Sequence, residues 1–92
     1  MVTLSVTPSR IAAVLADTAD LLEKEGWDPY LSPLINAIDR AAGYAEASLL
    51  AALDALAVQL GDEWPGDWER RPERTQAEVL AALRAAAGRW AA

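Results

Sequence analysis

The chain has 92 residues, a net charge of −6 at neutral pH and 53% hydrophobic residues, and it contains neither Cys nor His. This length predicts a single domain over residues 1–92 with a small core, and the patterns described below predict that it is helical. The missing residue types exclude disulfides, thiolate nucleophiles, imidazole bases and Cys/His zinc sites, and the acidic balance argues against a nucleic-acid partner.

The sequence shows no pattern of a signal peptide or of a membrane span. The longest apolar stretch, residues 48–60, is interrupted by Asp54 and is shorter than the roughly 20 residues that cross a bilayer. We therefore expect a cytoplasmic protein with no membrane partner, no cofactor and no metal.

The first predicted helix covers residues 8–25. Residues 2–6 alternate and suggest either a short strand or an extended lead-in, but no second strand is available to pair with them. Thr7 and Pro8 are typical of a helix N-cap followed by Pro at the first helical position. Apolar residues then recur every three to four positions, and Gly26 is expected to end the helix as a left-handed C-cap.

Two further helices are predicted over residues 33–42 and 45–60. Ser32 and Pro33 repeat the cap-then-Pro pattern. In the second of these helices a heptad-like row is formed by Leu49, Leu53, Leu56 and Leu60. We interpret this helix as the central one of a monomer, buried around most of its circumference; the alternative is an oligomer seam, so the protein is a monomer or a homodimer.

The last predicted helix covers residues 76–88. Thr75 and Glu78 have the spacing of a capping box, in which each side chain bonds to the backbone amide of the other residue. The sequence therefore predicts an all-α fold: a compact four-helix domain with one long Trp-containing loop before the last helix.

That loop, GDEWPGDWERRPERT, spans residues 61–75. Pro65 and Gly66 match the central positions of a type II turn. Trp64 and Trp68 either staple the loop onto the helices or present a binding surface, and we favour stapling because an untethered loop of about fourteen residues is unusual in a compact domain. We expect Trp68 to be the more buried of the two and Trp64 to be the better candidate for a contact with another molecule.

Three arginines, Arg70, Arg71 and Arg74, follow in the same loop. They are candidates for binding a partner, or an anion at the start of the last helix. The alternative that we favour is pairing with the nearby acidic residues Glu63, Asp67, Glu69 and Glu73. The candidate partner-binding residues are thus Trp64, Trp68, Arg70, Arg71 and Arg74.

Carboxylates are the most plentiful reactive groups. Asp17, Asp20 and Glu23 share one face of the first helix and suggest a metal site or an acid pair. We favour a solvated face on which Asp20 pairs with Lys24. A carboxylate-based enzyme or a small-ligand protein would need a pocket beside a tryptophan that holds two or more of Asp17, Asp20, Glu63, Asp67 and Glu69.

Two patterns bear on nucleic acids. Residues 42–44, Ala-Gly-Tyr, lie between two helices as in a helix-turn-helix, but the following helix begins without Arg or Lys. The 14 acidic residues could instead imitate DNA, yet they are scattered and interleaved with arginines. A helical hairpin and an ordinary acidic surface are the preferred interpretations.

The chain also resembles a family of small uncharacterised proteins from actinobacteria and their phages. The resemblance is carried by Leu21–Trp27, by Asn36–Gly43 and by the stretch from Trp68 through Pro72 and Arg74-Thr75 to Glu78-Val79-Leu80. Glu69 and Arg70 stand where the family usually shows Asn and Asp, and the Cys that often precedes its second helix is missing. The resemblance implies a helical fold and this origin, but no activity.

For function, the sequence favours a non-catalytic protein-protein interaction or regulatory module whose protein partner is unidentified. The alternatives are a small-ligand or carboxylate-based enzyme, and a regulator related to nucleic acids.

Overall fold

The computed structural model describes residues 6–91 and contains five helices in that range. They are α1 (Pro8–Glu25), α2 (Leu34–Ala41), α3 (Glu46–Gln59), the short α4 (Pro65–Glu69) and α5 (Gln76–Trp90). The all-α prediction is confirmed, and the four long helices lie within two residues of their predicted bounds. The proposed strand or lead-in at residues 2–6 lies, except for Val6, outside the described residues. The Cα radius of gyration is 12.4 Å, close to the value of about 12 Å expected for a compact chain of this length.

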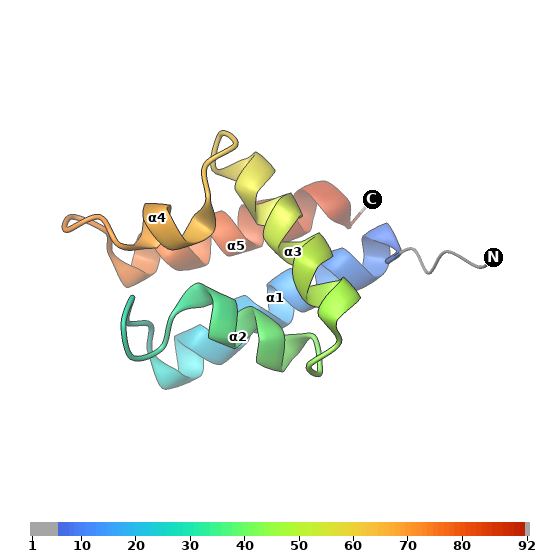
Figure 1. The fold of residues 1–92 in the computed structure, drawn as a ribbon, viewed down its shortest axis with the longest axis horizontal. Coiled ribbons are helices and arrows are strands. Elements are labelled where there is room, and N and C mark those ends of the chain that lie inside the picture. Colours follow the sequence, from blue (N-terminus) through green and yellow to red (C-terminus); the bar gives the residue numbers. More distant parts are fainter. Residues whose placement is uncertain (1–5, 92) are drawn as a thin grey trace.

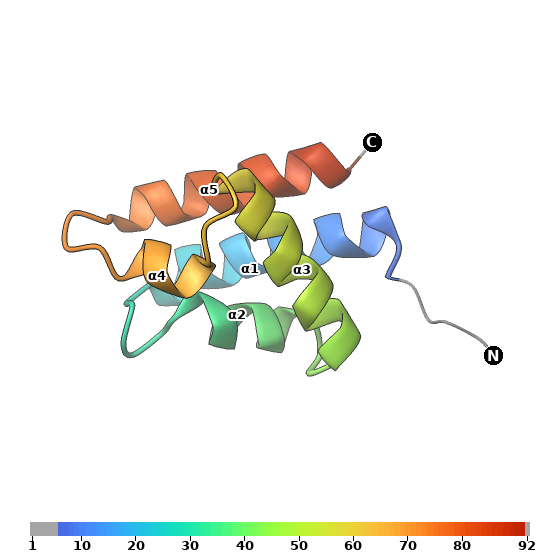
Figure 2. The same ribbon diagram turned by 45° about the horizontal axis from the view of Figure 1, so that its top comes forward.

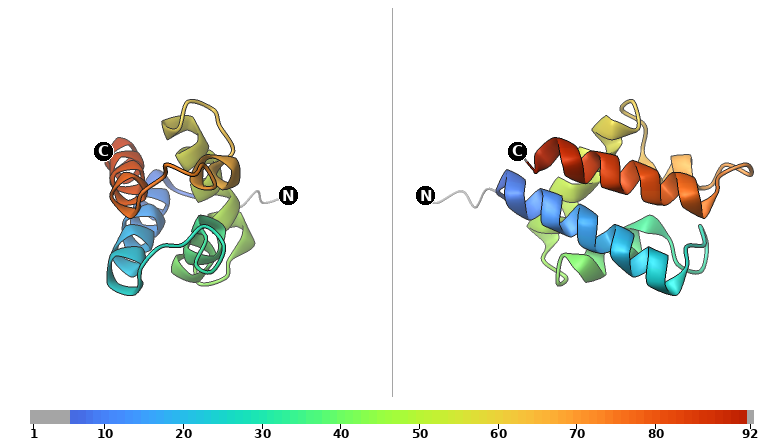
Figure 3. Two further views of the ribbon diagram at one scale, coloured as in Figure 1. Left: turned by 90° about the vertical axis from the view of Figure 1, so that its left-hand side faces the viewer. Right: turned by 180° about the vertical axis from the view of Figure 1, so that it is seen from behind.

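The helices form two layers. In one layer α1 and α5 lie side by side and antiparallel; in the other α2 and α3 pack against them, and α4 packs against α2 and α3 (Figures 1, 2 and 3). Both α1 and α5 contribute small buried side chains, including Ala19 and Ala86. Such residues let helix backbones approach closely, while Leu15, Leu56 and Leu83 supply larger buried apolar surface between the layers.

The central helix α3 is buried on one side rather than around its circumference. Leu53 and Leu56 belong to the core, whereas Leu50 is 52% and Val58 46% exposed. The expectation of a helix buried on nearly all sides is therefore wrong. The reason is that α1, α2, α4 and α5 leave one side of α3 uncovered.

Local capping signals account for the starts of α1 and α5. The Thr7 hydroxyl oxygen accepts a hydrogen bond from the backbone amide of Arg10 at 3.1 Å. The Thr75 hydroxyl oxygen accepts from the Glu78 amide at 3.2 Å, and the Glu78 carboxylate accepts from the Thr75 amide at 2.9 Å. The capping box is confirmed.

The start of α2 differs from the prediction. Pro33 is the N-cap residue, and no side chain of the cap itself bonds to the helix. The Ser32 amide instead donates to the Asp28 carbonyl at 2.9 Å within the preceding turn, so Ser32 belongs to that turn. The free amide at the start of α2 finds its acceptor elsewhere in the chain, at Glu69.

The long loop contains a helix of its own. Pro65 is the first residue of α4, and Gly66 has a helical backbone without positive φ. The predicted type II turn is therefore wrong: Pro fits the first helical turn as readily as it fits a turn, and the following Asp67 and Trp68 amides donate to the Trp64 carbonyl, each at 3.1 Å.

Among the helices of residues 6–91, none combines the length and the apolar character that a membrane span requires.

Candidate functional site

Trp64 stands at the N-cap of α4 with its side chain only partly covered. The residue is 50% exposed, while its carbonyl holds the first turn of the helix. A Cβ atom placed on Gly66 would lie 2.7 Å from Nε1 and 3.2 Å from Cδ1 of the Trp64 indole. The ring therefore folds back over Gly66, and this position depends on the missing side chain there. An aromatic ring is thereby held at the surface by a short, structured backbone.

Beside this ring lies a small cavity of about 140 Å³, which we call the Trp64 cavity. Apolar side chains make up most of its wall: Pro33, Ile35, Leu53, Trp64 and Pro65. They come from the start of α2, from α3 and from α4, so the cavity forms only where these three helices meet. Ile35 is 41% exposed, and together with Trp64 it gives the cavity an apolar rim that solvent reaches.

Arg70 is the exposed charged residue of the cavity wall. No ion pair is formed by its guanidinium within the described residues. Glu69, its neighbour in the chain, also lines the cavity, but the oxygens of this carboxylate accept hydrogen bonds from groups in the protein. The cavity thus combines an apolar rim with one positive charge.

Glu69 is almost completely buried, with 2% of its surface exposed. Its Oε1 accepts a hydrogen bond from the Leu34 backbone amide at 2.9 Å and another from the Trp27 indole Nε1 at 3.1 Å. Burial raises the pKa of Glu69 above its ordinary value, although both hydrogen bonds and the nearby Arg70 act in the opposite direction. This carboxylate takes the place of the missing side-chain cap of α2 and ties that helix to α4.

Trp68 and Arg74, neither of which lines the Trp64 cavity, form a pair. The Arg74 guanidinium carbon lies 3.8 Å from the centre of the Trp68 ring, and its Nε donates to the Trp68 carbonyl at 3.1 Å. The Arg74 side chain is only 10% exposed and also contacts the Glu78 carboxylate at 3.3 Å. Trp68 is half-buried against the core, so the prediction that it is more buried than Trp64 is confirmed.

The five predicted partner-binding residues therefore fall into three groups. Trp64 and Arg70 share the cavity, Trp68 and Arg74 stack on each other, and Arg71 forms an ion pair with Glu63. The three arginines are predicted to pair with Glu63, Asp67, Glu69 or Glu73. Among residues 6–91 only one such ion pair is found, between Arg71 and Glu63. The reason is geometric: Arg74 reaches forward into α5, and Glu69 is turned inward.

The acidic face of α1 is occupied by an arginine from α5. Arg84 contacts the Asp20 carboxylate at 3.1 Å and the Glu23 carboxylate at 3.3 Å. The expected pair of Asp20 with Lys24 is not formed, because the antiparallel packing of α1 against α5 brings Arg84 within reach. Among residues 6–91 no group of three or more acidic side chains is placed to hold a metal ion.

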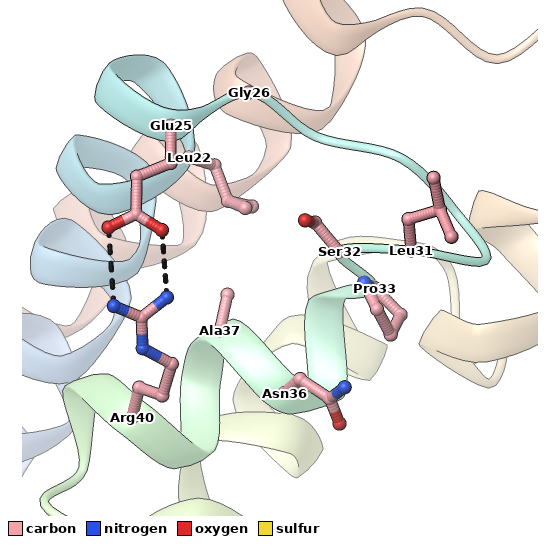
Figure 4. A pocket seen from close by; sticks show the side chains of 9 residues that line it. All are labelled: Leu22, Glu25, Gly26, Leu31, Ser32, Pro33, Asn36, Ala37 and Arg40. Carbon is pink, nitrogen blue, oxygen red and sulfur yellow. Dashed lines mark hydrogen bonds and ion pairs between the residues drawn. The ribbon is translucent and has the colours of Figure 1, made fainter.

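A second cavity, of about 180 Å³, lies between the end of α1 and α2 (Figure 4). Its wall includes the Glu25–Arg40 ion pair, in which both guanidinium nitrogens donate to the carboxylate, at 2.8 and 3.2 Å. The pair lowers the pKa of Glu25. Because the charges of Glu25 and Arg40 are paired with each other, the wall of this cavity carries no unpaired charge from these two residues.

Sequence reasoning missed the role of Trp27 and the contacts that close the turn after it. Trp27 lies in the connector between the first two predicted helices, yet its indole donates to Glu69 and its amide donates to the Gln76 side chain at 2.9 Å. The next turn is closed by Asp28, whose carboxylate accepts from the amides of Tyr30 and Leu31 at 2.8 and 2.9 Å. The Asp-Pro pair in this connector was a signal for such a turn, whereas nothing local indicated the partners of Trp27.

Comparison with known proteins places the chain in a family without a known role. Residues 33–89 match a family described as "Family of unknown function (DUF6197)". This range covers α2 to most of α5, and so includes every residue of the Trp64 cavity. No curated protein matches the chain. No solved structure matches it either.

Proposed function

The chain belongs to the DUF6197 family, and we propose that it is a non-catalytic module that binds a protein partner through the Trp64 cavity. The proposal places it in the cytoplasm and, on the strength of the resemblance described above, in an actinobacterial or phage setting. The observation that carries the proposal is the half-exposed Trp64 ring held beside an apolar cavity.

The size of the cavity favours a protein side chain over a metabolite. Sites for small molecules usually have volumes of roughly 300–1,000 Å³, whereas the Trp64 cavity has about 140 Å³. A volume of about 150 Å³ accommodates one benzene-sized group. Binding energy at protein interfaces is concentrated in such small pockets and in Trp, Tyr and Arg side chains, and both Trp64 and Arg70 line this one.

The carboxylate-based alternative receives less support. Of the five carboxylates considered for it, the Trp64 cavity holds only Glu69. The Leu34 amide donates to both oxygens of the Glu69 carboxylate, at 2.9 and 3.3 Å, and the Trp27 indole donates to Oε1, so a ligand would have to compete with these donors. A structural role for Glu69 therefore accounts for its position better than a catalytic one.

The proposal is tested by capture of partners from an actinobacterial lysate with three forms of the full chain. The forms are the wild type, Trp64→Ala and the control Leu50→Ala, since Leu50 is 52% exposed on a different part of the surface. We expect a protein that is retained by the wild type and by Leu50→Ala but lost with Trp64→Ala. Equal retention by all three forms, or a saturable metabolite in the absence of any captured protein, would contradict the proposal.

A further inference from the structure

We infer that the Trp64 cavity recognises an acidic segment of its protein partner, in which a bulky apolar side chain lies close to an Asp or Glu carboxylate. This inference rests on the proposed function and specifies the chemistry of the partner. Two features of the site carry it: the cavity accepts one apolar group, and Arg70, which forms no ion pair among residues 6–91, lines its wall.

The bulky apolar residue of the partner segment is inferred from the apolar wall and the small volume of the cavity. Ile35, Leu53 and Pro65 surround a volume of about 140 Å³, which fits a Phe or Leu side chain and excludes a second one. The Trp64 ring, fixed over Gly66, forms one side of that volume. A bulky side chain inserted there removes apolar surface from water on both partners.

The acidic residue of the partner segment is inferred from the contacts that the three arginines of the loop already make. Arg71 is paired with Glu63, and Arg74 is stacked on Trp68 and largely buried. Arg70 remains as the exposed arginine that lines the cavity. A guanidinium binds a carboxylate through two parallel hydrogen bonds, which gives both strength and orientation.

The net charge of −6 repels an acidic segment at long range, but at the binding site the charges closest to the segment determine the interaction. At physiological ionic strength, charges more than about 8 Å apart are largely screened. The other charged residue of the wall, Glu69, points its carboxylate at Leu34 and Trp27 inside the protein. Of the two charged residues in the wall, Arg70 is therefore the exposed one that an incoming carboxylate can contact.

Selection from a phage-displayed library of random 12-residue peptides, at physiological salt, tests the inference. We expect the wild type to enrich peptides that carry a bulky apolar residue and an Asp or Glu within about four positions of it. Arg70→Glu is expected to enrich peptides with Lys or Arg in that place. The control Arg89→Glu, which makes the same change of charge on α5 away from the cavity, is expected to enrich the same peptides as the wild type.

The best peptide is then synthesised and titrated against the wild type and three variants. We expect Arg70→Ala to weaken binding at least fivefold, Trp64→Ala at least tenfold, and Arg89→Ala by less than twofold. Thermal unfolding of each variant checks that the fold is retained.

Three results would overturn the inference. Peptides that depend on Trp64 but lack acidic residues, or that ignore Arg70→Ala, would contradict the acidic segment and leave the proposed function standing. A selection that yields no Trp64-dependent peptide would contradict both. Sedimentation of the wild type as a dimer that Trp64→Ala dissociates would identify a second copy of the chain as the occupant instead.

Discussion

The carboxylate of Glu69 accepts a hydrogen bond from the backbone amide of Leu34 at 2.9 Å, across 35 positions of the chain. Leu34 is the first residue of α2, and its N-cap, Pro33, has no side-chain acceptor. A residue of α4 thus caps α2 from outside the helix. The same contact fixes α4, and with it Trp64, against α2, so the stability of this corner and the shape of the Trp64 cavity are linked.

Removal of the Glu69 carboxylate is expected to destabilise the fold. Glu69→Ala leaves the buried Leu34 amide and the Trp27 indole nitrogen without an acceptor, and each unsatisfied donor costs about 1–3 kcal/mol. We expect a loss of about 2–4 kcal/mol in the free energy of unfolding, measured by urea denaturation. Glu73→Ala, which removes an exposed carboxylate nearby, is the control, and a loss as small as the one it produces would contradict the capping role.

The raised pKa of Glu69 predicts a dependence of stability on pH. The folded state holds the proton of this carboxyl more tightly than the unfolded state, whose pKa is near the ordinary 4.5. The contribution of Glu69 is therefore fully present below pH 4.5 and declines as the pH rises through the higher pKa of the folded state. We expect the wild type to lose stability relative to Glu69→Gln as the pH is raised from about 4 to about 7.

Glu25 is predicted to affect the pH dependence of stability in the opposite direction to Glu69. Its pKa is lowered by Arg40, so its contribution is present above the ordinary pKa of 4.5 and is lost as the pH falls through the lower value of the folded state. Relative to Glu25→Gln, the wild type is expected to gain stability as the pH rises. Urea denaturation at several pH values distinguishes the two cases, and the same sign for both would contradict the assignment of Glu69.

The stacked pair of Trp68 and Arg74 is expected to hold the loop against α5. Trp→Ala changes in a full core cost about 3–5 kcal/mol, and because Trp68 is less exposed than Trp64 and packs against the core we expect Trp68→Ala to cost about 2–4 kcal/mol. Trp64→Ala is expected to cost less than about 1 kcal/mol, since half of Trp64 is already exposed. Equal shifts of the urea midpoint would contradict the division between a structural and a surface tryptophan.

A double-mutant cycle separates the stacking of this pair from its packing. Trp68→Phe, Arg74→Lys and the combination of both are expected to give a coupling energy of about 0.5–1 kcal/mol. Lys keeps the charge but loses the planar group that lies 3.8 Å from the ring centre. Additive effects of the two changes would contradict a direct interaction.

The parts of this fold that the sequence predicts are those with local causes. The starts of α1 and α5 follow from Thr7 and from the capping box at Thr75, whose partners lie three positions away. The Glu69–Leu34 contact has no such signal, because only the packing of α4 onto α2 brings the two together. The Trp64 cavity depends on the same packing, which is why the sequence indicated Trp64 and Arg70 but not Ile35 or Leu53 as their neighbours.

Gly66 offers a change at the cavity that removes no side chain from its wall. In Gly66→Ala the new Cβ would lie 2.7 Å from the Trp64 indole nitrogen, so we expect the half-exposed ring to swing away. Stability should change by less than about 1 kcal/mol, because Ala favours the helix and offsets the displaced contact. A shift of the Trp64 indole signal in the NMR spectrum checks this displacement.

Gly88→Ala is the matched control for that change, since a Cβ placed there would meet nothing within 4 Å apart from its chain neighbours and the backbone of its own helix. It is expected to stabilise α5 by about 0.5–1 kcal/mol and to leave the Trp64 signal unchanged. A Trp64 signal that is the same in Gly66→Ala and in the wild type would contradict the fixed position of the ring.

The most direct test of the central claim is the dissociation constant of the captured partner for the wild type, Trp64→Ala and Leu50→Ala, measured by calorimetry. If the Trp64 cavity is the binding site, Trp64→Ala weakens binding at least tenfold, about 1.4 kcal/mol, and Leu50→Ala leaves the constant unchanged. Equal dissociation constants for the wild type and Trp64→Ala would show that the partner binds elsewhere.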